Sequence, residues 1–200
     1  MLIKCRDFAN VGVPPTSKPC FYMPQFTLEL NEVYFFTATI LNWKNLLASD
    51  RYKQIILESL LFLSQKKKIA IYGFVIMPNH IHLIWEMLDK NGQELPYASF
   101  MKFTAHQFRK DLLKNDLAYL AEFEKPKIDR NHQFWLRNSL PVHLYNPKVV
   151  EQKLDYIHHN PVSGKWNLSD NYVDYPYSSA KFYEEEIDSF GFLVHYKERF

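Results

Sequence analysis

The chain has 200 residues, enough for one compact domain with a sizeable core and too few for two ordinary domains. Its 24 basic and 22 acidic residues nearly balance, so net charge alone does not indicate a nucleic-acid-binding protein. Two cysteines, Cys5 and Cys20, exclude a disulfide framework, and no apolar run is long enough to cross a membrane. Charged residues also stand where a signal peptide needs its apolar run, so a cytoplasmic protein is expected.

Hydrophobic periodicity predicts alternating strands and helices from residue 33 onward. Strands are expected where β-branched and aromatic residues gather, and helices where apolar residues recur at helical spacing. The last helix should end before Pro161, because the residue before proline is driven away from helical geometry. In chain order, the predicted elements are strand 33–41, helix 50–65, strand 69–76, a turn at 78–79, strand 80–85, a helix or pair of helices over 97–120, strand 134–142 and helix 146–160.

This order predicts an α+β domain in which an antiparallel sheet carries packed helices on one or both faces. Residues 1–31 contain four prolines and little periodicity, and are expected to form an irregular N-terminal arm. The domain itself is expected to span residues 32–183. Residues 184–200 begin with three glutamates and are expected to form a C-terminal tail.

The sharpest local signal is the sequence His80-Ile81-His82 in the third predicted strand. Side chains alternate between the two faces of a strand, so both histidines should point the same way and Ile81 the other way. Two imidazoles so placed can chelate one divalent ion. A histidine pair on a strand is also compatible with polar surface, or with hydrogen-bonded groups in the core.

A second pair, Tyr156 and Asn160, lies four residues apart in the last predicted helix, so both side chains share one face. The buried stripe of this helix should be formed by Val150, Leu154 and Ile157, which leaves the pair on its flank. Lys153 falls near the same flank, where it could contact a phosphate or simply remain solvated. Taken alone, the pair is explained more simply by a boundary tyrosine and an asparagine that ends the helix.

Three segments together resemble the HUH (His-hydrophobic-His) single-tyrosine transposases, particularly the branch called REP-associated tyrosine transposases. Residues 73–83 (GFVIMPNHIHL) resemble the histidine signature, residues 156–162 (YIHHNPV) the tyrosine helix, and residues 174–179 (DYPYSS) the tail segment of that branch. Residues 134–137 and 99–105 match more loosely. One departure stands out: after Asn160-Pro161-Val162 the family usually continues with a basic residue and Ala-Gly, whereas this chain has Ser163-Gly164-Lys165-Trp166.

The resemblance implies a ferredoxin-like fold related to RNA-recognition domains and a DNA transposase activity. His80, His82 and Asn160 would then hold Mg²⁺ or Mn²⁺, and Tyr156 would attack a DNA phosphodiester to give a 5′-phosphotyrosine and a free 3′-hydroxyl. A covalent link conserves the bond energy, so the reverse attack can rejoin a different strand. The residues themselves do not identify the group that deprotonates Tyr156.

The resemblance also implies a partner, single-stranded DNA with a hairpin or palindromic structure, met at the nucleoid in the cytoplasm of a bacterium. It leaves both a monomer and a homodimer open. Binding such DNA needs cations along the phosphates. The candidates are Lys102, Arg109, Lys110 and Lys114 on one predicted helix, together with Arg137 and Lys153.

Two other functions use the same residues. A domesticated relative would bind hairpin DNA without productive transposition, and a metal-dependent nuclease would cut DNA with Tyr156 as a structural residue only. All the residues that the transposase chemistry needs are present, which favours the strand transferase.

Overall fold

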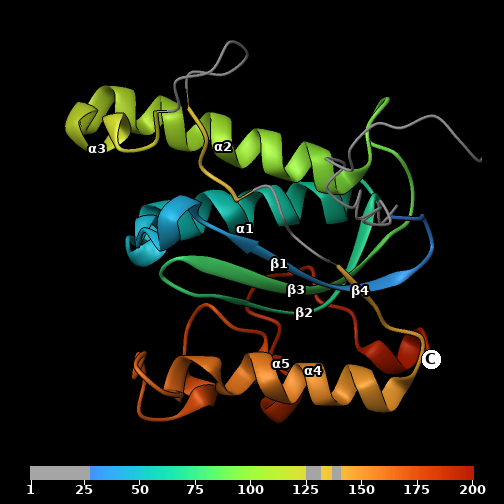
Figure 1. Ribbon diagram of the computed structural model, residues 1–200. Helices are drawn as coiled ribbons and strands as arrows, with labels where there is room; N and C mark the ends of the chain where they lie inside the picture. The colour runs from blue at the N-terminus through green and yellow to red at the C-terminus, as the bar shows by residue number, and fades with distance from the viewer. Residues whose placement is uncertain (1–27, 125–131, 137–140) are drawn as a thin grey trace, which may run out of the picture.

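The computed structural model describes residues 28–124, 132–136 and 141–200. This part of the chain forms one antiparallel sheet between two layers of helices (Figure 1). The strands are β1 (Val33–Thr39), β2 (Ile69–Ile76), β3 (His80–Met87) and β4 (Val142–His143). The α-helices are α1 (Asp50–Gln65), α2 (Pro96–Asn115), α3 (Leu117–Ala121), α4 (Pro147–His159) and α5 (Ala180–Glu185). Short 3-10 turns are η1 (Leu41–Trp43), η2 (Leu46–Ala48), η3 (Asn160–Val162), η4 (Tyr172–Asp174) and η5 (Tyr196–Glu198).

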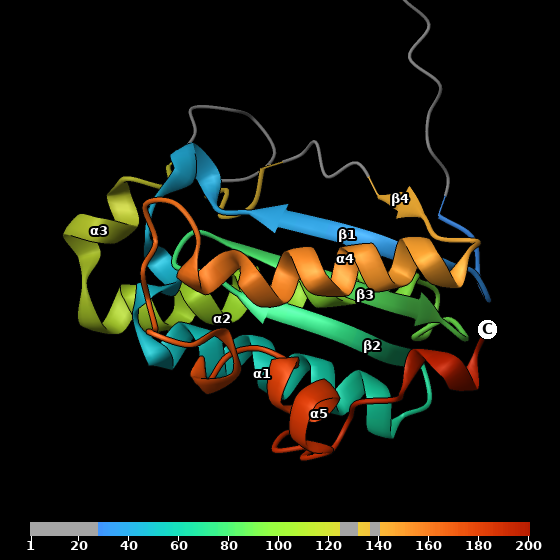
Figure 2. The ribbon, with the colours of Figure 1, turned by 90° about the horizontal axis from the view of Figure 1, so that it is seen from below.

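The sheet has the strand order β2-β3-β1-β4, and each neighbouring pair is antiparallel. With α1 and α2 on one face, this is the β-α-β-β-α-β arrangement of ferredoxin-like domains, and the predicted α+β class is confirmed. Helices α4 and α5 cover the opposite face (Figures 1 and 2). None of the helices in the described ranges combines the length and apolar character needed to span a bilayer.

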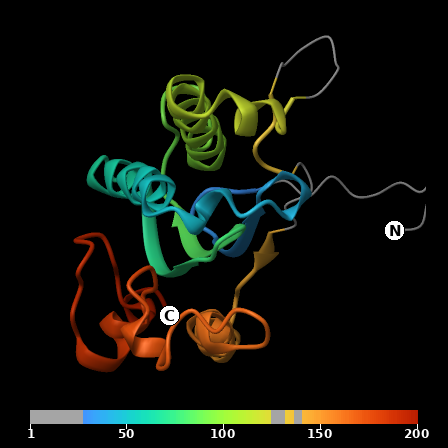
Figure 3. The ribbon, with the colours of Figure 1, turned by 90° about the vertical axis from the view of Figure 1, so that its left-hand side faces the viewer.

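Strand alternation divides the apolar side chains into two cores, one on each face of the sheet (Figure 3). On β3, Ile81, Leu83 and Trp85 belong to the larger core, which is shared with α1 and α2. Ile84, of the opposite parity, belongs to the smaller core under α4. His80 and His82 have the parity of Ile84, so the fold directs both histidines toward α4.

Helix α4 approaches the sheet closely because β2 presents a glycine beneath it. The register between β2 and β3 shifts between Ile71 and Gly73, and this bulge brings Gly73 under the helix. A Cβ atom at Gly73 would lie 2.4 Å from Leu154 Cδ2 and 3.5 Å from Ile157 Cδ1, both on α4. Val150, Leu154 and Ile157 are buried, as predicted for the apolar stripe of this helix.

The outer edge of β2 is covered by the segment that follows α4. Ile76 N donates to Tyr177 O at 2.9 Å, and Ser179 N donates to Phe74 O at 3.0 Å. The buried His158 on α4 is 2.8 Å from Ser179 Oγ, which ties the helix to this edge. Residues beyond 183 pack as well: Leu193 bridges Ile71, and both Phe192 and Tyr196 are buried. An edge paired in this way no longer offers unpaired backbone groups to another strand.

The predicted fourth strand over 134–142 is wrong in its extent. The only strand there in the described residues is β4, Val142–His143, while Trp135 makes a single bridge to Ile40 and residues 137–140 lie outside the description. Phe134 and Trp135 are both buried, although they are adjacent in sequence. Because the Trp135 indole donates to Thr104 Oγ1 on α2 at 3.0 Å, its position serves packing against α2 and not a strand ladder. The predicted helix or helix pair over 97–120 is a pair, α2 and α3.

The contact at Gly73 gives a prediction on stability. Gly73→Ala should lower the free energy of unfolding by about 1–3 kcal/mol, the usual cost of overpacking a core, as measured by urea denaturation. The clash is with the Leu154 side chain. In a double-mutant cycle with Leu154→Ala, the cost of Gly73→Ala should therefore shrink. Strictly additive effects of the two substitutions would contradict this assignment.

Candidate active site

His80 and His82 form a compact pair on β3, with ring centroids 4.8 Å apart. The alternation expected of the strand is thus confirmed. Both are nearly buried, at 7% and 6% exposure. Burial, followed by the charge of Lys165, lowers the pKa of His80 to about 4. Burial, followed by the charges of His80 and Lys153, lowers that of His82 to about 3. At neutral pH both rings are therefore uncharged, the form in which imidazole ligates a metal.

Each ring is oriented through its Nδ1 atom. Asn79 Oδ1 lies 2.7 Å from His80 Nδ1, and Thr37 Oγ1 lies 2.7 Å from His82 Nδ1. The amide of Asn79 is itself fixed, because its Nδ2 donates to Trp43 O at 3.2 Å. Neither Nε2 atom has a hydrogen-bond partner within the described residues. An imidazole whose Nδ1 is held by an oxygen and whose Nε2 is left open is the arrangement seen in metal-binding histidines.

Tyr156 projects from α4 over this pair and is 51% exposed. Its ring meets that of His82 edge-on, with centroids 5.5 Å apart. Phe35, on the adjacent strand β1, stacks on His82 at 5.2 Å and lies 6.3 Å from the Tyr156 ring. A half-exposed phenol that contacts two stacked rings combines a defined position with access to a large substrate.

Two lysines bracket the histidine pair. Lys153 Nζ lies 4.8 Å from the centroid of Phe35 and 5.8 Å from that of Tyr156. Lys165 Nζ lies 5.0 Å from the centroid of Trp166, a ring that is itself 5.9 Å from His80. Lys153 was predicted from the sequence to lie on the flank of α4, and the structure brings it to the site. These two ammonium groups supply local positive charge that the overall balance of the chain conceals.

Asn160 ends α4, one helical turn beyond Tyr156. Its Nδ2 atom is buried and has no hydrogen-bond partner among the residues that the structure describes. A buried amide atom without a partner is costly, and the O and N atoms of an amide are assigned only from their partners. With the amide turned so that its oxygen takes this position, the unpartnered atom is an acceptor suited to a divalent ion. No hydrogen bond joins Asn160 to either histidine in the described residues, and no three His, Cys, Asp or Glu side chains converge there.

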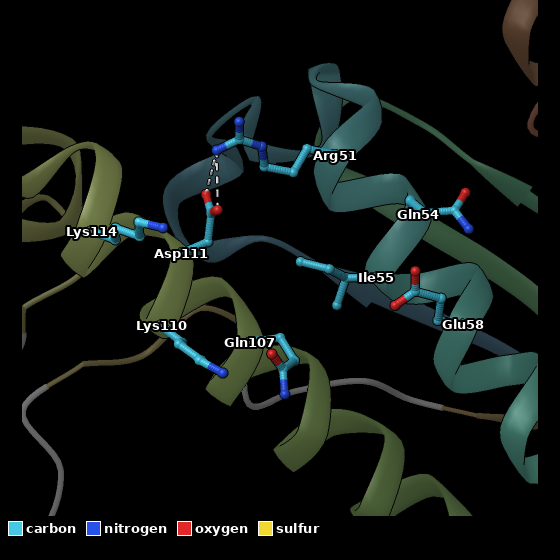
Figure 4. A pocket seen from close by; sticks show the side chains of 8 residues that line it. All are labelled: Arg51, Gln54, Ile55, Glu58, Gln107, Lys110, Asp111 and Lys114. Carbon is cyan, nitrogen blue, oxygen red and sulfur yellow. Dashed lines mark hydrogen bonds and ion pairs between the residues drawn. The ribbon is translucent and has the colours of Figure 1, made fainter.

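The predicted phosphate-binding residues of α2 lie elsewhere. Because α2 covers the opposite face of the sheet, Lys102, Arg109, Lys110 and Lys114 are not brought to the histidine pair (Figure 1). Lys102 is ion-paired with Glu94. Lys110 and Lys114 line a pocket between α1 and α2, together with Ile55 and the ion-paired Arg51 and Asp111 (Figure 4). Their contact with DNA stays a prediction, and Arg137 lies outside the described residues.

Sequence reasoning missed the side chains that orient the histidines. Thr37 faces His82 across the β1–β3 register, and no pattern within one strand reveals that register. Asn79 was assigned only to a turn. Glu86, on the same strand as the histidines, holds the C-terminal segment in place. Its Oε2 accepts from Tyr72 Oη at 2.6 Å and from Arg199 Nε at 3.1 Å, and the second bond anchors the C-terminal segment to β3.

No protein-family model and no curated protein matches this chain. Among solved structures, the chain is similar to that of a REP-associated tyrosine transposase bound to a REP hairpin. The two share 19% sequence identity and a TM-score of 0.54, and the match covers 86% of this chain and 92% of the other. At this identity the likeness establishes a shared fold.

The buried histidines predict a loss of stability in acid. His80, His82 and His158 have a pKa of about 4, 3 and 4 in the folded chain, against 6.5 ordinarily. Between pH ~6.5 and ~4 the unfolded chain binds protons that the folded chain excludes. The free energy of unfolding should therefore decrease as the pH is lowered through this range, and it should be constant above pH ~7. Each histidine contributes at most about 1.4 kcal/mol per pH unit.

Urea denaturation at several pH values would measure this slope. His158→Asn should flatten it, since one of the three titrating groups is removed. His106→Asn, on the exposed face of α2, is the matched control and should keep the slope of the unchanged protein. An equal slope in all three proteins would contradict the prediction.

Proposed function

We propose that this protein is a DNA strand transferase of the HUH single-tyrosine type, in the REP-associated branch, acting on single-stranded DNA that carries a hairpin. The observation that carries the proposal is the convergence of an exposed phenol, Tyr156, on a histidine pair with open Nε2 atoms. The shared fold with a REP-associated tyrosine transposase supports it. So does the local sequence, which resembles that family over the same residues.

In the proposed reaction, Tyr156 Oη attacks the phosphorus of a DNA phosphodiester. The bond from phosphorus to the 3′-oxygen breaks as the Oη–phosphorus bond forms, which leaves a 5′-phosphotyrosine and a 3′-hydroxyl. The phenol loses one proton and the leaving oxygen gains one, so the step needs no further reactant. Reversal by a different 3′-hydroxyl rejoins a new strand, which transposition requires. Lys153, beside the Tyr156 ring, is placed to contact the phosphate.

The residues present fit a divalent ion. His80 Nε2, His82 Nε2 and the Asn160 amide oxygen are the proposed donors, and burial keeps both imidazoles neutral for this role. Oxygen donors suit Mg²⁺, whereas the two imidazoles suit Mn²⁺ better. When bound, the ion would polarise the scissile phosphate and offset charge on the leaving oxygen.

The half-open geometry of the site supports the proposed substrate class. Tyr156 is half-exposed on the flank of α4, beside His82 and Phe35, where a flexible strand can reach it. Helix α4 lies across the sheet from α1 and α2 (Figure 2). The solved structure with the same fold is bound to a REP hairpin. We extend that substrate class to this chain, which would meet it at the bacterial nucleoid.

The covalent step gives the first prediction from this proposal. With Mn²⁺ and a labelled single-stranded hairpin carrying the gene's own flanking sequence, the protein should form a DNA adduct that survives denaturing electrophoresis. Tyr156→Phe should abolish the adduct, because it removes the nucleophilic oxygen. Tyr145→Phe is the matched control: Tyr145 is even more exposed, at 76%, and should leave the adduct unchanged.

The failures of this experiment are informative. Cleavage that persists in Tyr156→Phe would assign the protein to the metal-dependent nucleases. Hairpin binding with neither cleavage nor an adduct would assign it to the domesticated binders.

Metal binding can be tested without DNA. A ligand that binds only the folded chain stabilises it by about 2.7 kcal/mol at 100 times its dissociation constant, so Mn²⁺ should raise the melting temperature in a dose-dependent way. His82→Ala should remove this rise and Asn160→Ala should weaken it. His143→Ala is the control, since this exposed histidine is paired with Glu32. A rise that survives His82→Ala would refute the proposed ligand set.

A further inference from the structure

The turn after α4 carries an indole and an ammonium group to the edge of the site. Trp166 is partly buried against the smaller core, and its ring centroid is 5.9 Å from that of His80. Lys165 Nζ lies 5.0 Å from the Trp166 centroid.

The turn is held in place by its backbone. Trp166 N donates to Ser163 O at 3.2 Å, and Leu168 N donates to Pro161 O at 2.8 Å. Gly164 and Asn167 adopt positive φ angles of 59° and 40°, so the chain reverses sharply on both sides of the indole. The Trp166 ring is therefore presented in a fixed position, which lowers the entropic cost of stacking a base on it.

Tyr156 and Trp166 contact different members of the histidine pair. Tyr156 meets the ring of His82, and Trp166 meets the ring of His80. In phosphoryl transfer, the attacking and leaving oxygens lie roughly in line through phosphorus. A phosphate held at the histidine pair and attacked by Tyr156 thus directs its leaving 3′-oxygen away from His82 and toward the His80 side, where Trp166 lies.

We infer that Trp166 and Lys165 form a subsite for the unpaired nucleotide on the 5′ side of the cut, whose 3′-oxygen leaves when Tyr156 attacks. The base stacks on the indole. When the base is bound, the flexible Lys165 side chain leaves the indole ring and contacts the 5′-phosphate of that nucleotide. This inference rests on the proposed function and adds to it a position for the strand that departs. Retained there, the 3′-hydroxyl stays close to the phosphotyrosine that it can attack again.

A simpler role for Trp166 is to cover His80 and exclude water from it. The two roles differ in one measurable respect. Stacking depends on the presence of a base at one nucleotide of the substrate, whereas covering His80 does not depend on the substrate at all.

The test scans a missing base along the substrate. Full-length protein with Tyr156→Phe, which keeps the DNA uncut, is titrated against fluorescent hairpins, each carrying one abasic nucleotide in the single-stranded flank. The abasic substitution should weaken binding about tenfold at one position, the size of a lost base–aromatic stack. In Trp166→Ala the penalty at that position should vanish, and in Trp166→Phe most of it should remain.

Two controls accompany the scan. Phe103→Ala removes an aromatic that is 42% exposed on α2, across the sheet, and should leave the penalty unchanged. Thermal unfolding of the Trp166 variants checks that the folded state persists, and Trp166→Phe carries the test if the alanine variant unfolds. In protein that retains Tyr156, the cut is mapped from the 3′-hydroxyl product. The sensitive nucleotide should be the one that bears it.

The possible results separate the subsite from the chemistry. A sensitive position on the 3′ side of the cut, or penalties independent of Trp166, would overturn the inference. A Trp166-dependent position in a protein that forms no covalent adduct would retain a base subsite. It would overturn both the assignment to the leaving nucleotide and the proposed function. An adduct formed with no Trp166-dependent position would overturn the subsite alone.

Discussion

The close approach of α4 to the sheet at Gly73 is the constraint on which the rest of the site depends. Leu154 and Ile157 occupy the space that a side chain on β2 would fill. Because both residues belong to the helix that carries Tyr156, their seating decides how far the phenol lies from His82. The β-bulge beside Gly73 contributes to this close approach, because it turns the strand so that the glycine faces the helix. The absence of a side chain at Gly73 on β2 thus lets α4 pack at the distance that brings Tyr156 beside His82.

The two faces of the sheet differ in how much apolar surface they bury, and the candidate site lies on the face with the smaller core. The face under α1 and α2 buries the larger apolar core, including Trp85 and Phe36. The α4 face instead buries two neutral histidines and a tyrosine–carboxylate pair, Tyr72 and Glu86, which contribute less apolar burial. Polar groups of this kind are tolerated because the opposite core supplies hydrophobic stabilisation. The orientation of the two histidines then depends on hydrogen bonds with Thr37 Oγ1 and Asn79 Oδ1, which cost little once the strands are paired.

Patterns confined to one element were predictable from the sequence, and relations between elements were not. Spacing alone indicated the helix that ends before Pro161, its apolar stripe and the shared face of His80 and His82. The failures arose at long range. Residues 134–136 have strand-like composition, yet Trp135 packs on Thr104 of α2. The sequence also did not place Lys102, Arg109, Lys110 and Lys114 relative to the histidine pair, because nothing in one helix reveals on which face of the sheet it will lie.

The residues proposed for catalysis and those proposed to bind a base lie on different kinds of backbone structure. His80, His82 and Tyr156 stand on a central strand and a helix, where backbone hydrogen bonds hold them to the tolerance that bond formation demands. Trp166 and Lys165 stand on a turn, where sequence changes disturb no ladder of hydrogen bonds. In this chain the turn places an indole and a cation near His80, so that a change of sequence there moves none of the groups proposed to make or break a bond.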